Sequence, residues 1–379
     1  MQTVEIREVV TKADMKKFIY FNYKLYEGSP YAVPDLYMDV ENNFNPKKNA
    51  GLEFCDVKLF LAYRGNEVVG RIAGIINHRA NKTWNDKYVR FGWIDFIDDI
   101  EVCRSLLKAV EDWGRDKGMT DIHGPLGITD MDPEGMLIEG FDRISTMSTI
   151  YNYPYYPKLM EAIGYEKGID WIEMRMLIPK TIPEKFKKIG DIVKARSKVH
   201  IKKLNGKDDL FNKGYGQRVF NLINEAYAPL YGYSEMTERQ IEQYVKEYLP
   251  MVDMRMVTIV ETDDTNEVVG VGISMPSIVR TLQKVKGRLF PFGWLRLLNA
   301  LKWHHEDGVE LLLVAVKPEY QNKGINSLLF CDLIPIFNEM GFKWAETNPQ
   351  LETNSKGQAQ WQYIEHEIAK RRRCYKKSL

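Results

Sequence analysis

The chain has 379 residues, of which 44% are hydrophobic and 12% aromatic, with a formal net charge of +1. This length favours two domains, and the small net charge gives no overall reason to expect nucleic acid or a membrane surface as a partner. The four cysteines have no spacing suited to zinc or a redox motif. No apolar run is long enough to span a bilayer and the N-terminus carries no secretory signal, so we expect a cytoplasmic protein.

The first half of the chain predicts a strand, a helix, a hairpin, a strand, a helix and a short strand. The hairpin is indicated by alternating apolar residues on both sides of the polar turn 64–67. Residues 28–54, rich in Pro, Asn and Tyr, are predicted to be a loop. The elements are expected at residues 1–10, from about 13 to 23, 57–63 with 68–76, 88–96, 102–113 and 121–125.

The same order of elements returns after residue 197, apart from one additional helix. The expected positions are 199–204, 210–227, 238–248, 255–260 with 268–274, 309–316, 325–340 and 343–346. Two copies of one α/β unit in a single chain follow from this repetition. We place the first copy at residues 1–178, a connector at 179–198 and the second copy at 199–379.

Residues 309–340 carry the most specific pattern. The apolar run 309–316 is typical of a strand covered on both faces, and Pro318 must end or splay it because proline cannot donate to a sheet ladder. The turn Gln321-Asn322-Lys323-Gly324 then leads into an amphipathic helix. Such a junction leaves backbone N–H groups unpaired in front of the helix dipole. It is therefore an anion site, and phosphate is its usual occupant.

The spacing Gln321-x-x-Gly324 resembles the acetyl-coenzyme A loop of the GCN5-related N-acetyltransferases, the GNAT superfamily. That motif reads Arg or Gln, two residues, Gly, one residue, then Gly or Ala, and this chain departs from it at Asn326. The resemblance implies an α/β (α+β) fold of two tandem GNAT-like domains, each a mixed, mostly antiparallel sheet flanked by helices. It also implies acetyl-CoA or another acyl-CoA as acyl donor. By resemblance, its binding residues would be Val314, Val316, Gln321, Asn322, Lys323, Gly324, Ile325 and Asn326.

The first copy lacks the phosphate turn. Residues 96–101 contain no glycine and three carboxylates, which would repel a pyrophosphate. Residues 159–165 resemble the family's closing segment, but Met160 stands where the family often keeps a tyrosine acid, and methionine has no proton to give. We therefore expect the first copy to be catalytically silent.

Acyl transfer to an amine needs a base for the amine proton and an acid for the departing thiolate. Glu346, near the end of the strand predicted at 343–346, is the preferred base, and Glu310 is the second candidate. Tyr363 is the candidate acid; it follows Trp361, which stands where the family's tyrosine falls. Tyr375 is a weaker candidate in the basic run 371–377, which we interpret as a solvated last strand.

The predicted function is N-acyl transfer, most simply acetyl transfer, from acyl-CoA to a small-molecule or peptide amine. We assign no metal site, because the adjacent histidines 304 and 305 cannot face one ion from one helix side. We expect no nucleic acid partner, and the sequence gives no signal for an oligomeric state. The loop 124–135 and the tyrosines of 151–156 suit either an amine-binding pocket or an ordinary loop.

Three alternatives stay open. Transfer of a long fatty acyl group is favoured by the apolar insert 289–303, which could cover the pocket, dock on the first copy or shelter an acyl chain. A Fem-type aminoacyltransferase, which uses aminoacyl-tRNA, is disfavoured by the retained Gln321 and Gly324. A non-catalytic coenzyme A-binding or scaffold protein is permitted by Asn326 and Trp361.

Overall fold

The computed structural model describes residues 3–206, 208–303 and 306–379, and the chain forms two compact units. Unit 1 consists of Met1–Ile172, Val279–Leu298 and Ala369–Leu379, and unit 2 consists of Glu173–Ile278 and Asn299–Ile368. Each unit therefore contains segments from both halves of the sequence. The repeat boundaries at residues 178 and 199 rest on element order alone and stay a prediction.

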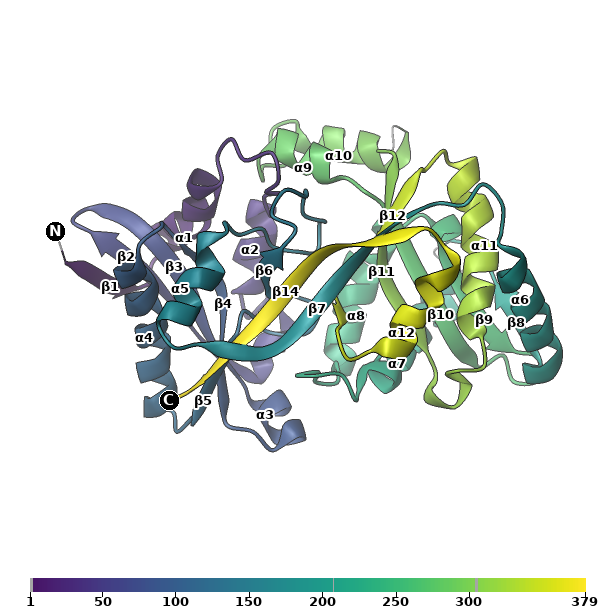
Figure 1. Ribbon diagram of the computed structural model, residues 1–379, viewed down its shortest axis with the longest axis horizontal. Coiled ribbons are helices and arrows are strands. Elements are labelled where there is room, and N and C mark those ends of the chain that lie inside the picture. The colour runs from purple at the N-terminus through teal and green to yellow at the C-terminus, as the bar shows by residue number, and fades with distance from the viewer. Residues whose placement is uncertain (1–2, 207, 304–305) are drawn as a thin grey trace. The chain divides into compact units, whose positions relative to one another are not determined.

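Each unit is built on a sheet with helices beside it (Figure 1). The strands that begin in unit 1 are β1 (Val4–Glu8), β2 (Cys55–Arg64), β3 (Glu67–Asn77), β4 (Tyr88–Phe96), β5 (Asp121–Gly124), β6 (Met136–Glu139) and β7 (Glu166–Leu177). Strand β14 (His366–Ser378) begins in unit 2 and ends in unit 1. The other strands are β8 (Val199–Lys202), β9 (Val257–Thr262), β10 (Val268–Pro276), β11 (Gly308–Val316), β12 (Trp344–Thr347) and β13 (Gln350–Leu351).

The helices follow the predicted order with additions. Those of the first half are α1 (Lys12–Leu25), α2 (Tyr37–Asn43), α3 (His78–Trp84), α4 (Ile100–Asp116), α5 (Tyr155–Ala162) and α6 (Glu184–Ser197). Those of the second half are α7 (Tyr215–Tyr227), α8 (Glu238–Glu247), α9 (Val279–Val285), α10 (Gly293–Lys302), α11 (Ile325–Glu339) and α12 (Ser355–Ala359). Short helical turns lie at Ala50–Glu53, Asp208–Asn212, Leu249–Met251, Met254–Met256, Pro318–Tyr320 and Gln360–Tyr363.

The two sheets share one pattern of strand directions. The described strands form one hydrogen-bonded sheet in the order β1-β2-β3-β4-β5-β14-β7-β12-β11-β10-β9-β8, and we call its first six strands the sheet of unit 1 and the remaining six the sheet of unit 2. In each sheet one neighbouring pair is parallel, β4 with β5 and β11 with β12, and the other pairs are antiparallel. The predicted fold, two mixed and mostly antiparallel sheets flanked by helices, is confirmed.

Strands β7 and β14 each pass from one unit into the other. Residues 173–177 of β7 pair with β12 in unit 2, although the rest of β7 belongs to the first unit. The C-terminal residues 375–378 of β14 pair with β5 in unit 1. Each sheet is thus completed by a strand from the other half of the chain.

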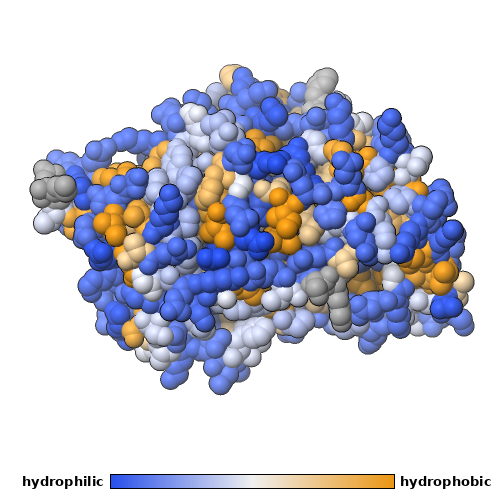
Figure 2. Space-filling view, in the orientation of Figure 1, coloured by the Kyte–Doolittle hydropathy of each residue, from blue (hydrophilic) through white to orange (hydrophobic). Residues whose placement is uncertain are grey.

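Helix α11 packs on the sheet of unit 2 through an apolar core that includes Val260, Leu328 and Leu329. Glycine in β10 lets the helix begin close to the sheet, because a Cβ atom on Gly270 would lie 2.7 Å from Ile325 Cγ2. This close approach positions the first turn of α11 directly above the central strands. On the face drawn in Figure 2, most exposed residues are hydrophilic, and the exposed hydrophobic residues form separate groups.

Two expectations are corrected. Residues 28–54 are not all loop, because α2 forms there and buries Val40 in the core beside Phe18. The basic run 371–377 is a strand as predicted, but it is not solvated: Arg372 and Tyr375 are fully buried. Arg373 binds both oxygens of Asp170 at 2.8 and 3.1 Å. Distant carboxylate and carbonyl partners, which the local charge pattern does not reveal, make this burial possible.

Candidate active site

The site in unit 2 begins where β11 and β12 separate. Their parallel register runs from Gly308 opposite Trp344 to Leu311 opposite Thr347 and then stops. Leu312 is an extra residue, because β10 pairs Ser274 with Leu311 and Ile273 with Leu313. Such a β-bulge bends the strand and ends regular pairing. Beyond Leu311 β12 no longer pairs with β11; the Asn348 side chain donates to the Leu312 carbonyl at 2.6 Å, and the edge that follows, which we call the open edge, has no strand beside it among the described pairings.

Val314 and Val316 lie on this open edge. The N–H of Lys317 donates to Val269 of β10 at 2.9 Å. Because backbone groups alternate in direction along a strand, the N–H and C=O groups of Val314 and Val316 point away from β10. Side chains contact their carbonyl oxygens instead: the Tyr227 hydroxyl donates to Val314 and the Gln321 amide to Val316, each at 3.1 Å. The open edge therefore has amides that a ligand can pair with.

The predicted phosphate turn forms at the start of α11. Asn322 and Gly324 both have left-handed backbone angles, with φ of 62° and 87°. Gly324 is the N-cap of α11, and no side chain caps the helix there. Its missing Cβ also matters for packing, since a Cβ would lie 2.6 Å from Ile189 Cγ2 of α6. The first turn thus keeps its donors and its dipole available for an anion.

Asn326, the departure from the family motif, faces a pocket. Its side-chain oxygen is buried and accepts no hydrogen bond from any described residue. Leaving a buried acceptor unsatisfied costs roughly 1–3 kcal/mol. The pocket that it lines is a natural place for the donor that this oxygen lacks.

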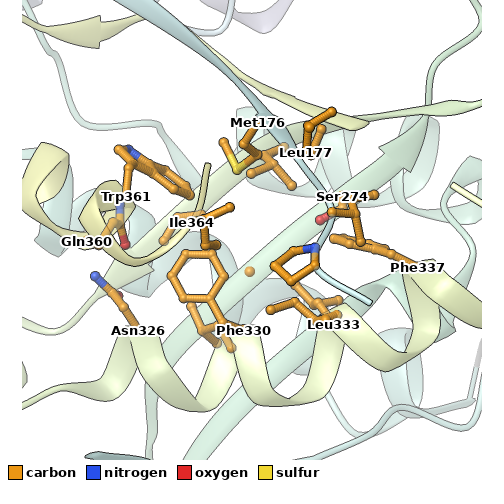
Figure 3. Close-up of a pocket in the computed structure, with 18 residues that line it drawn as sticks. Met176, Leu177, Ser274, Asn326, Phe330, Leu333, Phe337, Gln360, Trp361 and Ile364 are labelled. Carbon is orange, nitrogen blue, oxygen red and sulfur yellow. The ribbon is translucent and has the colours of Figure 1, made fainter. Parts of the chain in front are cut away.

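The pocket follows α11 away from the turn (Figure 3). It has a volume of about 40 Å³ and is walled by Phe330, Leu333 and Phe337 on the helix. Trp361 and Ile364 lie across from them. The eleven steps from Asn326 to Phe337 advance about 16 Å along a helix axis. The pocket is therefore long, narrow and almost wholly apolar.

The two predicted bases lie side by side on the other face of the sheet. Glu310 and Glu346 are opposite each other in the parallel register and are 1% and 2% exposed. Their sequence neighbours Leu311 and Ala345 line the pocket, so by strand alternation both carboxylates point to the opposite face. Ser277 Oγ donates to Glu310 at 3.0 Å. Both lie about 7 Å along the strands before the separation point.

Arg175 is the cationic neighbour of Glu346. Its Nη1 lies 3.6 Å from Glu346 Oε2, and its guanidinium lies over the Trp344 ring, 3.8 Å from the centroid. The pair comes from adjacent strands, because Arg175 stands opposite Glu346 in the register of β7 with β12. Glu346 is therefore held in place by its surroundings.

Tyr363, the predicted acid, packs against α6. Its ring makes an edge contact with Phe186 at 5.8 Å, and Lys185 Nζ lies 4.1 Å from the ring centroid. Gln362 donates to its hydroxyl at 2.6 Å. None of these contacts joins it to the open edge or to the two glutamates, so its role as acid stays a prediction. Trp361 is a buried wall of the pocket.

Tyr227, which sequence reasoning missed, is the hydroxyl that reaches the open edge. It is the last residue of α7 and donates to Val314 at 3.1 Å. Burial raises the pKa of Tyr227 to about 12, so the hydroxyl keeps its proton at neutral pH. No motif marks this tyrosine, because its position depends on how α7 packs against β11.

In unit 1 the backbone groups at the end of β4, which correspond to those of the open edge, are hydrogen-bonded to side chains of the same unit. The Tyr155 hydroxyl donates to the carbonyl of Phe96 at 2.5 Å, and the Phe96 N–H donates to Tyr156 Oη at 3.2 Å. Asp99 caps α4 by accepting from the N–H groups of residues 101 and 102. The backbone N–H at this strand end, whose counterpart in unit 2 lies on the open edge, is therefore satisfied internally in unit 1.

The loop after β5 in unit 1 contains a half-buried carboxylate, Asp132. Asp132 accepts from the Thr129 N–H at 2.9 Å, and burial raises the pKa of Asp132 to about 6. The ionised carboxylate thus destabilises the folded state at pH values above 3.8, which is the ordinary pKa of an aspartate.

Among the described residues, no group of three or more metal-binding side chains occurs in this loop or elsewhere. Histidines 304 and 305 lie outside the described residues.

The fold and this site define the class of the protein. A tandem GNAT protein from the clavulanic acid biosynthesis pathway superposes with a TM-score of 0.57 at 13% identity, covering 99% of this chain and 98% of that one. A GCN5-related N-acetyltransferase from Anabaena variabilis gives a TM-score of 0.50 at 8% identity, covering 98% and 72%. The chain has the tandem GNAT fold, as the sequence predicted. No family model matches it.

Two relatives place the chain more closely. It is 29% identical over 382 residues to Protein YghO of Escherichia coli K12, covering 99% of this chain and 95% of the relative. It is 30% identical over 317 residues to the bacterial ceramide synthase of Caulobacter vibrioides, covering 83% and 80%. The chain belongs to the family of this bacterial ceramide synthase.

Asn326→Asp tests the phosphate turn better than a change at Gly324, whose site has no room for a side chain. An aspartate near a helix N-terminus stabilises the free helix by about 0.3–1 kcal/mol, yet it repels a pyrophosphate. Because the side-chain oxygen at this position is buried without a donor, the carboxylate should also lower the Tm without ligand, so the decisive readout is loss of the Tm increase that acyl-CoA gives the wild type.

Asn221→Asp on the exposed side of α7 is the control. Asparagine and aspartate can both accept the hydrogen bond that the Gln217 side chain donates at this position. It should keep the full ligand-induced increase in Tm. An equal increase in Asn326→Asp would contradict the assignment of the turn.

Asp132→Asn tests the half-buried carboxylate of unit 1. Asparagine keeps an acceptor for the Thr129 N–H but cannot ionise. The variant should gain about 1–3 kcal/mol in the free energy of unfolding above pH 6 and almost nothing below pH 4. Urea unfolding across this pH range measures the difference. A constant difference at all pH values would show that ionisation is not its cause, and Asp112→Asn on the surface is the control.

Proposed function

We propose that this protein is an acyltransferase that moves a long acyl group from acyl-CoA to the amine of a long-chain amino alcohol. The observation that carries the proposal is the apolar pocket, which runs from Asn326 at the phosphate turn to Phe337, past the open edge of β11. An acetyl group would leave most of this length unused. Burial of each additional methylene contributes about 0.8 kcal/mol of binding.

The family supports the same acceptor class. The Caulobacter relative is named a ceramide synthase, and a ceramide is an amide between a fatty acid and a long-chain amino alcohol. Both partners of such a reaction are amphipathic molecules with one polar end. A site with a polar entrance and a deep apolar interior suits substrates of this kind.

The residues present fit acyl-CoA. Amides on the open edge at Val314 and Val316 suit the pantetheine, and the uncapped turn 321–326 suits the pyrophosphate. The buried oxygen of Asn326 lacks a donor, and a pantetheine amide has one to give. When bound, acyl-CoA supplies a thioester whose carbonyl carbon an amine can attack.

The reaction forms one C–N bond and breaks one C–S bond, while the amine loses a proton and the sulfur gains one. We assign Tyr227 as the acid that gives the departing sulfur its proton, because its hydroxyl lies at the open edge and its raised pKa keeps it protonated. A backbone N–H at Val314 or Val316 would stabilise the developing oxyanion. Glu346 and Glu310 would receive the amine proton on the opposite face of the sheet, with Ser277 and Arg175 holding them in place.

The narrow pocket must widen for an acyl chain to enter. Phe330 and Trp361 form an edge contact at 5.4 Å across it, and they belong to different elements. Moving this pair apart would open the interior without disturbing the strands. The aromatic walls would then exclude water from the thioester.

The direct test is a chain-length series of acyl-CoA donors with a sphingoid-type amine, followed by mass detection of the amide. Palmitoyl-CoA should be used with a kcat/KM well above that of acetyl-CoA. A preference for acetyl-CoA, or no amide with any donor, would refute the proposal.

Ala345→Val should shorten the preferred acyl chain. Ala345 lies on the sheet side of the pocket, and two added methyl groups would occupy space next to Leu333. Enzymes with apolar pockets distinguish two substrates that differ by one methylene by about 10- to 200-fold in kcat/KM, so we expect at least a tenfold loss of kcat/KM with palmitoyl-CoA. Activity with octanoyl-CoA should change about threefold or less. Ala345→Ser, which adds little volume, is the control; equal losses for both donors in Ala345→Val would contradict the pocket assignment.

Tyr227→Phe separates the two tyrosine candidates. Removing a donor to a developing charge typically lowers kcat by about 10²- to 10³-fold, and the affinity for acyl-CoA should stay unchanged. Tyr363→Phe should retain kcat within about twofold, because that ring packs on α6. The reverse result would restore Tyr363 as the acid and remove Tyr227 from the mechanism.

A further inference from the structure

The insert between β10 and β11 is anchored to unit 1 by α9. The Gln283 side chain donates to the carbonyls of Pro30 and Ala32 at 3.1 and 2.9 Å, and the carbonyl of Gly287 accepts from the Tyr37 N–H at 2.9 Å. Gly287 itself is buried against Tyr23. Helix α9 and the turn after it are therefore packed on residues 30–37, while the use of the insert 289–303 stays a prediction.

Past this anchor the chain exposes large hydrophobic side chains. Phe290 and Phe292 are 70% and 68% exposed, and Trp294 and Leu295 at the start of α10 are 45% and 46% exposed. Ala300, one and a half turns further along α10, is buried. The four exposed residues, which we name the aromatic patch, follow one another within six positions of the chain. Isolated exposed apolar residues are common, but contiguous ones mark a surface that binds something.

The aromatic patch lies within a strongly basic segment. No Asp or Glu occurs from residue 268 to residue 305. Exposed cations stand on both sides of the patch, at Arg280, Lys284, Lys286, Arg288 and Arg296. The overall net charge of +1 conceals this local excess. The occupant of this surface must therefore be both apolar and negatively charged.

We propose that the aromatic patch and its flanking cations bind the surface of an anionic lipid bilayer. Aromatic side chains are favoured at the level of the headgroups, and Lys and Arg are attracted to anionic lipids. A second copy of the chain would bring two cationic segments together, which is unfavourable. The helix lies on the bilayer rather than across it, because the ten residues of α10 advance only about 15 Å against a hydrocarbon core of about 30 Å. None of the helices in the described ranges is long and apolar enough to cross a bilayer.

This inference goes beyond the proposed reaction and is tested without any substrate. Purified protein is floated with vesicles of phosphatidylcholine alone and of phosphatidylcholine mixed with phosphatidylglycerol. The wild type should bind the anionic vesicles at least about tenfold more tightly, and added salt should weaken the binding. A failure here leaves the acyl-transfer proposal untouched, because that proposal depends on the pocket in unit 2.

Two double variants separate the contributions. Phe292→Ser with Leu295→Ser removes inserted side chains, and Lys284→Glu with Arg296→Glu reverses two charges. Each should lower affinity for anionic vesicles by about tenfold or more, since one cation near such a surface is worth roughly fivefold. All four side chains are exposed, so Tm should change little. Ile192→Ser and Lys158→Glu, exposed positions outside the segment, should bind like the wild type.

Three results would overturn the proposal. One is absence of vesicle binding by the wild type, and another is unchanged binding in both double variants. The third is concentration-dependent dimerisation that Phe292→Ser with Leu295→Ser abolishes while no vesicle binds, which would assign the surface to a second copy.

Discussion

The separation of β11 from β12 at Leu312 is the constraint on which the site depends. A sheet normally pairs every backbone group of its inner strands, and an unpaired buried group is costly. Past the bulge, side chains replace the missing strand as hydrogen-bond partners. Tyr227 donates to the carbonyl of Val314, and Gln321 donates to the carbonyl of Val316. The phosphate turn and the pocket are both placed relative to that edge, because only a short connection separates the end of β11 at Val316 from the start of α11 at Ile325.

The contrast between the two copies shows what such an opening requires. In unit 1 the equivalent strand end is covered by Tyr155 and Tyr156, and Asp99 caps the helix that follows. The same fold is therefore compatible with a closed and stable end or with an open and reactive one. The difference depends on a few side chains, since the strand order and directions are the same in both sheets.

Local chemistry explains which features the sequence predicted. Pro318 cannot continue a strand and Gly324 permits the left-handed backbone at the helix start, so the end of β11, the turn and the start of α11 were predicted within one or two residues. The position of Tyr227 depends on helix packing, and the bulge at Leu312 depends on the register of three strands. No sequence pattern records either. The burial of Arg372 was missed for a similar reason, because it depends on carbonyl groups of residues 135 and 150 that lie more than two hundred positions away.

The exchanged strands have a consequence for how the molecule reaches its folded state. During synthesis the first half of the chain leaves the ribosome without the segment that pairs with β5, since that segment is part of β14 at the C-terminus. The sheet of unit 1 therefore has an uncovered edge at β5 until β14 has been made, and such edges invite pairing with other chains. The strands of unit 2 precede β14 in the chain, so the sheet of unit 1 is completed only after the strands of unit 2 have been synthesised.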